Sequence, residues 1–108
     1  MRSDRARFLA DVRRAVSEGR VVLYRVGNTE IYCVHSKSRS KTYVIIPDTF
    51  CSCSDFFFNI YLGRRKKKCY HIESLRLALE ENKIKINNIS KEEFRRSILP
   101  KILLGMLL

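Results

Sequence analysis

The first part of the chain carries apolar residues at helical spacing. Residues 3–18 place their apolar side chains on one side of a helix and arginines on the other, and Gly19 follows as a stop signal. The basic side is either a solvated surface or a phosphate contact. The pattern therefore predicts an amphipathic N-terminal helix, whose basic side includes Arg13 and Arg14.

The next stretch is dense in strand-forming residues with turn signals between them. Residues 20–26 and 29–35 are rich in Val, Ile and Tyr, and Gly27-Asn28 between them is typical of a type II′ hairpin turn. A third strand is predicted at residues 42–46. Because the strands follow one another through short turns, the sequence predicts a three-stranded antiparallel meander.

Two further helices are predicted in the second half of the chain. One spans residues 70–82 and buries an apolar stripe that includes Leu79. The other begins after Ser90, whose spacing from Glu93 is that of a capping box. Pro100 is expected to kink or split this last helix, because proline cannot donate a backbone hydrogen bond. Together these elements predict an α+β fold.

The C-terminal helix is apolar nearly all round. Its aliphatic run is too short to span a bilayer, so it must be buried on more than one side. Either it closes the core of its own domain, or it docks in the groove of a partner, or it does both. The candidate partner-binding residues are Ile98, Leu99, Ile102, Leu103 and Leu107.

Length and charge narrow the class of protein. A chain of 108 residues predicts one domain, and 22 Lys and Arg against 11 Asp and Glu give a formal net charge of +11. This balance favours polyanionic partners, of which nucleic acid is the usual one, while an acidic protein surface is the alternative. The candidate nucleic-acid contacts are the run Arg64, Arg65, Lys66, Lys67 and Lys68, the turn residues Lys37, Arg39 and Lys41, and Arg13 and Arg14.

Three thiols and one imidazole are spaced as metal ligands. Cys51 and Cys53 form one pair, and Cys69 and His71 form another, each with a single residue between its members. Cys3His is a standard structural zinc set, and four protein ligands leave no position for water or substrate. The spacing predicts one structural zinc ion, which joins a turn after the third strand to the helix 70–82.

The alternative for these cysteines is a disulfide framework. A bridge between Cys51 and Cys53 would be strained, and the charged N-terminus does not resemble a secretory signal. Reduced thiols favour an intracellular setting. Cys33 has no partner at ligand spacing, so we expect its side chain to be buried and to pack as a small apolar residue. For His35 we expect a solvated or core-edge side chain rather than a fifth ligand.

Cys-x-Cys, a gap and then Cys-x-His is the signature of the SWIM-type zinc finger, and Cys51, Cys53, Cys69 and His71 match it. The order of elements over about residues 20–105 resembles the small SWIM-domain subunit of Shu-type recombination complexes. Members of that family pair with a RecA/RadA-type recombinase paralogue and promote recombinase filaments on single-stranded DNA. The family usually has an alanine three residues after the histidine, where this chain has Ser74, whose buried hydroxyl would need a carbonyl one turn earlier.

The resemblance implies a single SWIM-type domain over residues 1–108, with the zinc finger at about 49–73 and an interaction helix at about 90–108. It implies a non-enzymatic adaptor for a RecA/RadA-family partner. The alternative is an autonomous nucleic-acid-binding zinc protein that self-associates through its C-terminal helix. An enzyme is the weakest hypothesis, since no nucleophile–base pair or phosphate loop accompanies the metal ligands. The compact length and the Lys- and Ile-rich composition suit an archaeal member, which would be cytoplasmic; a eukaryotic one would be nuclear.

Overall fold

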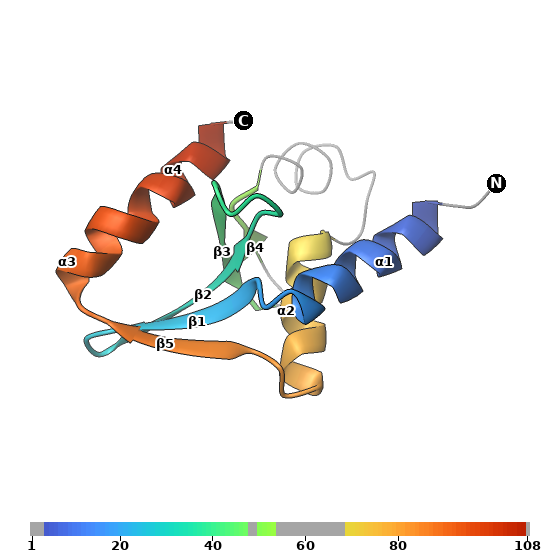
Figure 1. Cartoon of the computed structure of the whole chain (residues 1–108), viewed down its shortest axis with the longest axis horizontal. Helices are drawn as coiled ribbons and strands as arrows, with labels where there is room; N and C mark the ends of the chain where they lie inside the picture. Colours follow the sequence, from blue (N-terminus) through green and yellow to red (C-terminus); the bar gives the residue numbers. More distant parts are fainter. Residues whose placement is uncertain (1–3, 48–49, 54–68, 108) are drawn as a thin grey trace.

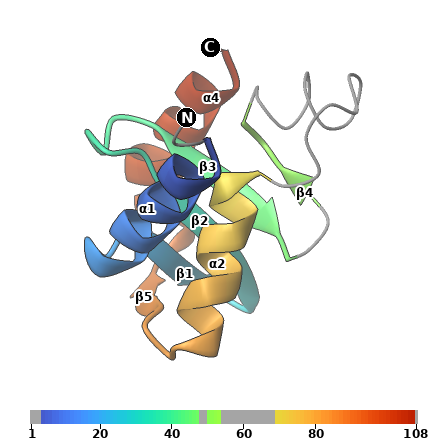
Figure 2. The same ribbon diagram turned by 90° about the vertical axis from the view of Figure 1, so that its right-hand side faces the viewer.

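The computed structural model describes residues 4–47, 50–53 and 69–107 and has an α+β architecture (Figure 1). A mixed five-stranded sheet, in the order β4-β3-β2-β1-β5, lies between two helical layers. Helices α1 and α2 cover one face, and the C-terminal helical segment covers the other (Figures 1 and 2). The elements are α1 (Asp4–Ser17), β1 (Val21–Val26), β2 (Thr29–His35), β3 (Thr42–Ile46), β4 (Phe50–Cys51), α2 (Tyr70–Glu80), β5 (Lys85–Ile89), α3 (Lys91–Glu93), the π-helical segment η2 (Phe94–Ile98) and α4 (Leu99–Leu107).

The predicted meander is present as β1, β2 and β3, which pair antiparallel in sequence order. The hairpin turn closes at the pair Val26 and Thr29, and Gly27 has a φ of +62°, as the first position of a type II′ turn requires. Alternation along these strands divides the apolar side chains between two cores. Val21 and Val34 face α1 and α2, whereas Val22 and Cys33 face the C-terminal helix.

Two edge strands extend the meander beyond the prediction. The short β4 pairs antiparallel with β3, and β5 pairs parallel with β1, so that Val22 lies opposite Lys85. The alternation of Lys83-Ile84-Lys85-Ile86 is the sequence signal for β5. Its side chains are mostly exposed, because β5 is an edge strand that the helical layers only partly cover.

Helix α2 presents a different face to the sheet from the predicted one. The buried residues are His71, Ser74, Leu75 and Ala78, at positions i, i+3, i+4 and i+7 of one helix face. Leu79, which was expected in the buried stripe, is exposed. The helix is rotated so that His71 points inward, and Leu79 falls just outside that face.

The C-terminal helix begins as predicted at Ser90, whose side-chain oxygen accepts a hydrogen bond of 3.1 Å from the Glu93 backbone N–H. The prediction of a break at Pro100 is only partly right, because helical structure continues through it. The irregularity lies just before it, where the Leu99 N–H bonds to the Phe94 carbonyl in a π-helical turn. A π-helical turn commonly accommodates a local interruption of the backbone hydrogen bonds of a helix.

None of the helices in the described part of the chain is both long and apolar enough to cross a membrane.

Candidate metal centre

The four predicted ligands come together where the edge of the sheet meets the start of α2. Cys51 lies in β4 rather than in a turn, and Cys53 follows two residues later. Cys69 is the N-cap residue of α2, and His71 lies in its first turn. Their ligand atoms all lie within 4.8 Å of one another, and all four side chains are buried. The metal set therefore joins an edge strand to a helix.

The distances fit a tetrahedral ion. The Sγ atoms of Cys53 and Cys69 are 3.5 Å apart, and the Cys69 Sγ is 3.5 Å from the His71 Nδ1. Zinc–sulfur bonds of about 2.3 Å at tetrahedral angles put sulfurs about 3.8 Å apart, so the four atoms already stand near the corners that zinc requires. All four cysteines of the chain are described, and none forms a disulfide. The site therefore fits one structural zinc ion, held by Cys51, Cys53, Cys69 and His71.

The thiols of the cluster do not hold their protons equally. Hydrogen bonds from Cys51 and then Cys53 lower the pKa of Cys69 far below its usual range. The same bonds, with Cys53 and Cys69 as partners, raise the pKa of Cys51, and burial adds to this rise. As N-cap residue, Cys69 also stands at the positive end of the α2 dipole, which favours a thiolate. As zinc ligands, all three cysteines would be thiolates.

Cys33 is the counter-example among the cysteines. It is fully buried between strands and the C-terminal helix, and burial raises its pKa to about 12. Its thiol therefore stays protonated and behaves as a small apolar side chain, which confirms the prediction for this residue.

Two tyrosine rings flank the histidine ligand. The Tyr43 ring centroid lies 4.3 Å from that of His71, and the Tyr70 centroid lies at 4.2 Å. The Ser74 Oγ donates a 2.6 Å hydrogen bond to the Tyr70 carbonyl, one turn earlier, as the sequence predicted for this buried hydroxyl. On its other side, Tyr43 meets α4 so closely that a Cβ on Gly105 would stand 3.0 Å from the ring.

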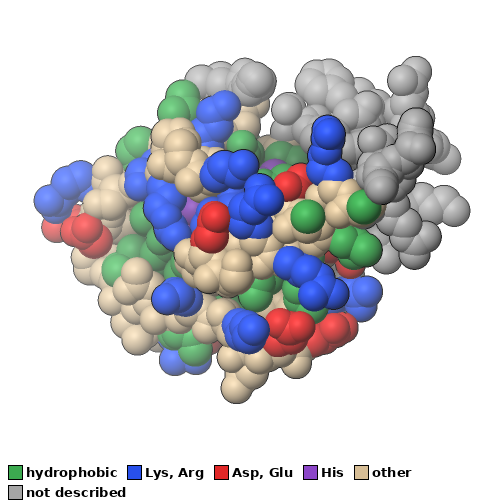
Figure 3. Space-filling view, turned by 45° about the vertical axis from the view of Figure 1, so that its right-hand side comes forward, with side chains coloured by type: hydrophobic (Ala, Val, Ile, Leu, Met, Phe, Trp, Pro, Cys, Tyr) green, Lys and Arg blue, Asp and Glu red, His purple; other side chains and the backbone are tan. Residues whose placement is uncertain are grey.

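Some of the basic residues that were predicted to contact nucleic acid lie on one side of the molecule. Lys37, Arg39 and Lys41 are in the β2–β3 loop, where the Arg39 Nη2 donates a 2.8 Å hydrogen bond to the Glu18 carbonyl. This bond draws the loop to the C-terminal end of α1, which carries Arg14 in its last turn. Figure 3 shows Lys and Arg side chains gathered across the middle of one face. The run Arg64, Arg65, Lys66, Lys67 and Lys68 lies outside the described residues.

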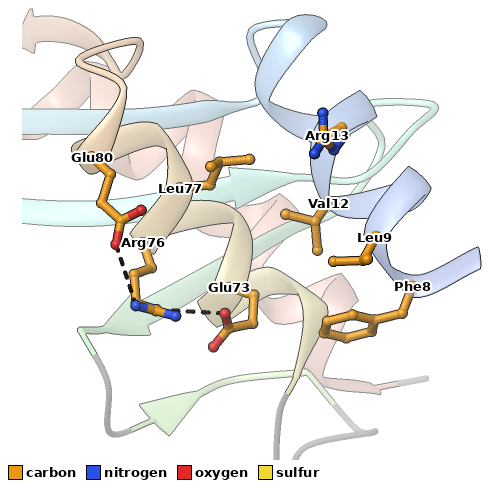
Figure 4. A pocket seen from close by; sticks show the side chains of 8 residues that line it. All are labelled: Phe8, Leu9, Val12, Arg13, Glu73, Arg76, Leu77 and Glu80. Atoms are coloured by element: carbon orange, nitrogen blue, oxygen red, sulfur yellow. Dashed lines mark hydrogen bonds and ion pairs between the residues drawn. The ribbon is translucent and has the colours of Figure 1, made fainter. Parts of the chain in front are cut away.

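Arg13 stands at the rim of a groove between α1 and α2 (Figure 4). The groove has a volume of about 140 Å³, and its apolar walls come from Phe8, Leu9, Val12 and Leu77. Arg76 spans its α2 side and pairs with Glu73 at 3.5 Å and with Glu80 at 3.3 Å. Arg13 therefore faces the mixed-charge side of α2, formed by Glu73, Arg76 and Glu80, across this groove.

The candidate partner-binding residues divide between two environments. Ile98 and Ile102 are buried against the sheet in the core that includes Tyr24 and Cys33. Leu99 and Leu103 point away from that core and are exposed. The side chain of Leu107 lies outside the described part of the structure.

A buried polar chain under the C-terminal helix was missed from the sequence. The His35 Nδ1 lies 2.8 Å from the Thr42 Oγ1, and its Nε2 lies 2.8 Å from the Tyr24 hydroxyl. Burial and then the charges of Lys101 and Arg39 lower the pKa of His35 to about 4. His35 is therefore a neutral core residue. The sequence did contain a signal for the contact between His35 and Thr42, because the predicted meander places these two residues opposite each other.

Arg20 is the second missed residue. Its side chain is buried at the start of β1, and its Nε lies 3.1 Å from the Glu18 Oε1 without the alignment of a hydrogen bond. Its Nη1 donates to the His35 carbonyl at 3.4 Å. Arg20 is thus a structural cation that ties the end of α1 to β2, although sequence alone offers no sign of its burial.

No protein-family model, curated protein or solved structure matches this chain.

Proposed function

We propose that this chain is a non-enzymatic, zinc-stabilised adaptor of the SWIM type. In this proposal it pairs with a RecA/RadA-family recombinase paralogue and assists recombinase function on single-stranded DNA during homologous recombination. The metal holds the fold, and the activity of the protein lies in the surfaces that the fold presents. It works in a reducing compartment: the cytoplasm of an archaeal host or the nucleus of a eukaryotic one.

The observation that carries this proposal is the buried cluster of Cys51, Cys53, Cys69 and His71, with all ligand atoms within 4.8 Å. A Cys3His set fills the tetrahedral positions of zinc and leaves none for a reacting molecule. Burial of every ligand also excludes substrate from the metal. An ion held in this way contributes folding free energy rather than chemistry.

The partner and DNA surfaces rest on the motif resemblance and on the distribution of side chains. Exposed aliphatic residues on the C-terminal helix supply an apolar contact for the recombinase paralogue. The β2–β3 loop supplies Lys37, Arg39 and Lys41 for phosphates, and the run from Arg64 to Lys68 adds to them. Such contacts position a nucleic-acid strand without reading its sequence.

The metal is tested with a matched pair of cysteine variants. Cys53→Ala removes a ligand, and Cys33→Ala removes a thiol that is equally buried but remote from the cluster. We expect one zinc per chain by elemental analysis in the wild type and in Cys33→Ala, and loss of zinc with loosened folding in Cys53→Ala. A wild-type protein that folds with no bound metal would contradict the proposal.

The partner is tested by affinity purification of the tagged full chain from its native host, with mass spectrometry of what co-purifies. We expect an ATPase of the RecA class, which should then form a complex of defined stoichiometry with the purified chain. That complex should increase recombinase loading on single-stranded DNA. If the purified chain shows no association with any RecA-class ATPase of its host, the adaptor proposal fails.

The strong positive charge keeps autonomous nucleic-acid binding as a second candidate. The isolated chain should then bind single-stranded DNA tightly, with an affinity that falls steeply as salt rises. Lys37→Gln with Lys41→Gln should weaken that binding, whereas Arg25→Gln with Lys91→Gln, which removes the same charge beside the β1–β2 turn at the other end of the meander, should not. Weak binding by the isolated chain, restored by a RecA-class partner, would favour the adaptor.

A further inference from the structure

The outer side of α4 carries an aliphatic stripe that the described part of the chain leaves uncovered. Leu99, Leu103 and Met106 stand at positions i, i+4 and i+7, so they share one side of the helix. Leu103 is 53% exposed and Met106 is 54% exposed. The inner side of the same segment carries Ile98 and Ile102, which are buried. Leu104 is 46% exposed beside the stripe. The helix is therefore apolar on two sides, and the sheet covers only the side of Ile98 and Ile102.

The spacing of this stripe is that of a coiled-coil seam. Residues repeating at i, i+4 and i+7 form the narrow a/d line along which a second helix packs. α4 is nine residues long, or about 14 Å at 1.5 Å per residue, which suits two turns of a partner helix. A helix that lies on a membrane carries a strongly charged polar side opposite its apolar side, whereas the side of this segment that carries Ile98 and Ile102 is apolar and buried against the sheet. The stripe therefore fits one helix better than a lipid surface.

The charge around the stripe indicates the chemistry of that helix. From residue 94 to residue 107 the chain has no Asp or Glu, and it has Arg95, Arg96 and Lys101. Arg95 and Arg96 are exposed one turn before Leu99, and within the described residues no carboxylate pairs with either guanidinium. A second copy of this surface would bring the same three cations, and its carboxylates closest in sequence are Glu92 and Glu93 at the start of the segment, of which Glu93 already accepts a hydrogen bond from Ser97. Like charges therefore disfavour a homodimer along this seam.

We propose that the stripe Leu99–Leu103–Met106 docks an acidic amphipathic helix of a partner protein. Its leucine-type residues pack along the seam, and its Asp or Glu residues pair with Arg95 and Arg96. This inference rests on the proposed role of the C-terminal helix as the partner surface, and it adds the chemical character of the element that binds there.

The probe is a synthetic, fluorescently labelled helical peptide with Leu at heptad a and d positions and Glu at the flanking positions. Its affinity for the full zinc-loaded chain is measured by fluorescence anisotropy. The first control peptide has the same composition in scrambled order, so that it keeps the charge but has no apolar side. The second control carries Lys in place of Glu. We expect saturable binding of the first peptide only.

Matched variants locate the binding surface on the chain. Leu103→Ala should weaken peptide binding about tenfold, as loss of a buried leucine contact would. Ile86→Ala is its control, because Ile86 is 52% exposed on β5, away from α4. Arg95→Gln with Arg96→Gln should also weaken binding, whereas Arg7→Gln with Arg13→Gln on α1 should not. All six substituted residues are exposed, and circular dichroism confirms that each of the four variants folds.

Four results would overturn the inference. Equal binding of the scrambled peptide, or full binding by Leu103→Ala, would show attraction by net charge alone. Concentration-dependent dimerisation that Leu103→Ala abolishes, seen by analytical ultracentrifugation, would make a second copy the occupant. Binding to vesicles of phosphatidylserine and phosphatidylcholine, without binding of the peptide, would make a membrane the occupant. The peptide assay contains neither recombinase nor DNA, so a negative result in it does not contradict the adaptor proposal. Conversely, failure to purify a RecA-class partner from the host does not contradict the proposal that this stripe binds an acidic helix.

Discussion

Acidification should destabilise the fold through His35. Its imidazole is buried between Thr42 and Tyr24, and its pKa is lowered from 6.5 to about 4. Above pH 6.5 the ring is neutral in both the folded and the unfolded chain. Between pH 6.5 and 4 the unfolded chain takes up a proton that the folded chain refuses, so stability falls as pH falls. A difference of about 2.5 pKa units at 1.36 kcal/mol each gives a maximal loss of about 3 kcal/mol.

The surroundings of His35 explain why this proton is refused. Burial is the main cause, and the positive charges of Lys101 and Arg39 act in the same direction. The neutral ring uses one nitrogen as donor and the other as acceptor, so that both short contacts are satisfied. A protonated ring would have to donate from both nitrogens, which turns both hydroxyls into acceptors.

The assay compares urea unfolding of the wild type and of His35→Gln from pH 7.5 to pH 4. All other ionisable groups are the same in the two proteins, so the comparison isolates the contribution of His35. His35 pairs with Thr42 at the start of β3, whereas the metal ligand Cys51 pairs with Ile45 near its end. The effect of the His35 substitution on stability should therefore be separable from that of the metal site. We expect the wild type to lose about 3 kcal/mol more than the variant.

A direct measurement accompanies this comparison. The chain has two histidines, so an NMR titration of the imidazole carbons can assign His35 by difference from the variant. A pKa near 6.5 for this ring, or identical pH dependence of stability in the two proteins, would refute the reasoning.

Substitutions at three positions test the packing around the metal and the C-terminal helix, each by urea unfolding. Gly105→Val should cost about 1–3 kcal/mol, because even a Cβ there would meet the Tyr43 ring at 3.0 Å; full stability would mean that α4 does not dock at this point. Ser90→Ala should cost about 1 kcal/mol through loss of the helix cap, and Ser90→Asp should restore it; an unchanged midpoint for the alanine variant would argue against the cap. Ser74→Ala should be within about 0.5 kcal/mol of wild type, because the lost bond to the Tyr70 carbonyl is offset by the higher helix propensity of alanine, and a loss above about 2 kcal/mol would contradict this.

Features governed by local chemistry could be predicted from the sequence. Gly27-Asn28 fixes a tight hairpin by the φ that glycine permits, and Ser90 caps a helix through its own side chain. The metal ligands were also predictable, because two short pairs with one intervening residue each need little help from the rest of the fold. In these cases the residues that determine the structure are close together in the chain.

The missed features depend on partners that are distant in sequence. β5 is a polar edge strand, and its pairing with β1 depends on where α2 ends. Leu79 was misassigned because the inward position of His71, and not the apolar pattern alone, sets the rotation of α2. The burial of Arg20 and His35 likewise follows from the arrangement of α1, β2 and α4, which no local pattern specifies.

The parallel pairing of β5 with β1 has a consequence for how the chain folds. β1 and β2 are joined by a two-residue turn, so they can pair early in folding. β5 is far from β1 in the sequence, so it can pair with β1 only after most of the chain has folded. Long loops close slowly, and a metal clip between Cys53 and Cys69 shortens the loop that separates the hairpin from α2. We therefore expect refolding with zinc to be faster than without it, with β5 the last strand to gain protection from hydrogen exchange. Zinc would then accelerate folding as well as stabilise the folded protein.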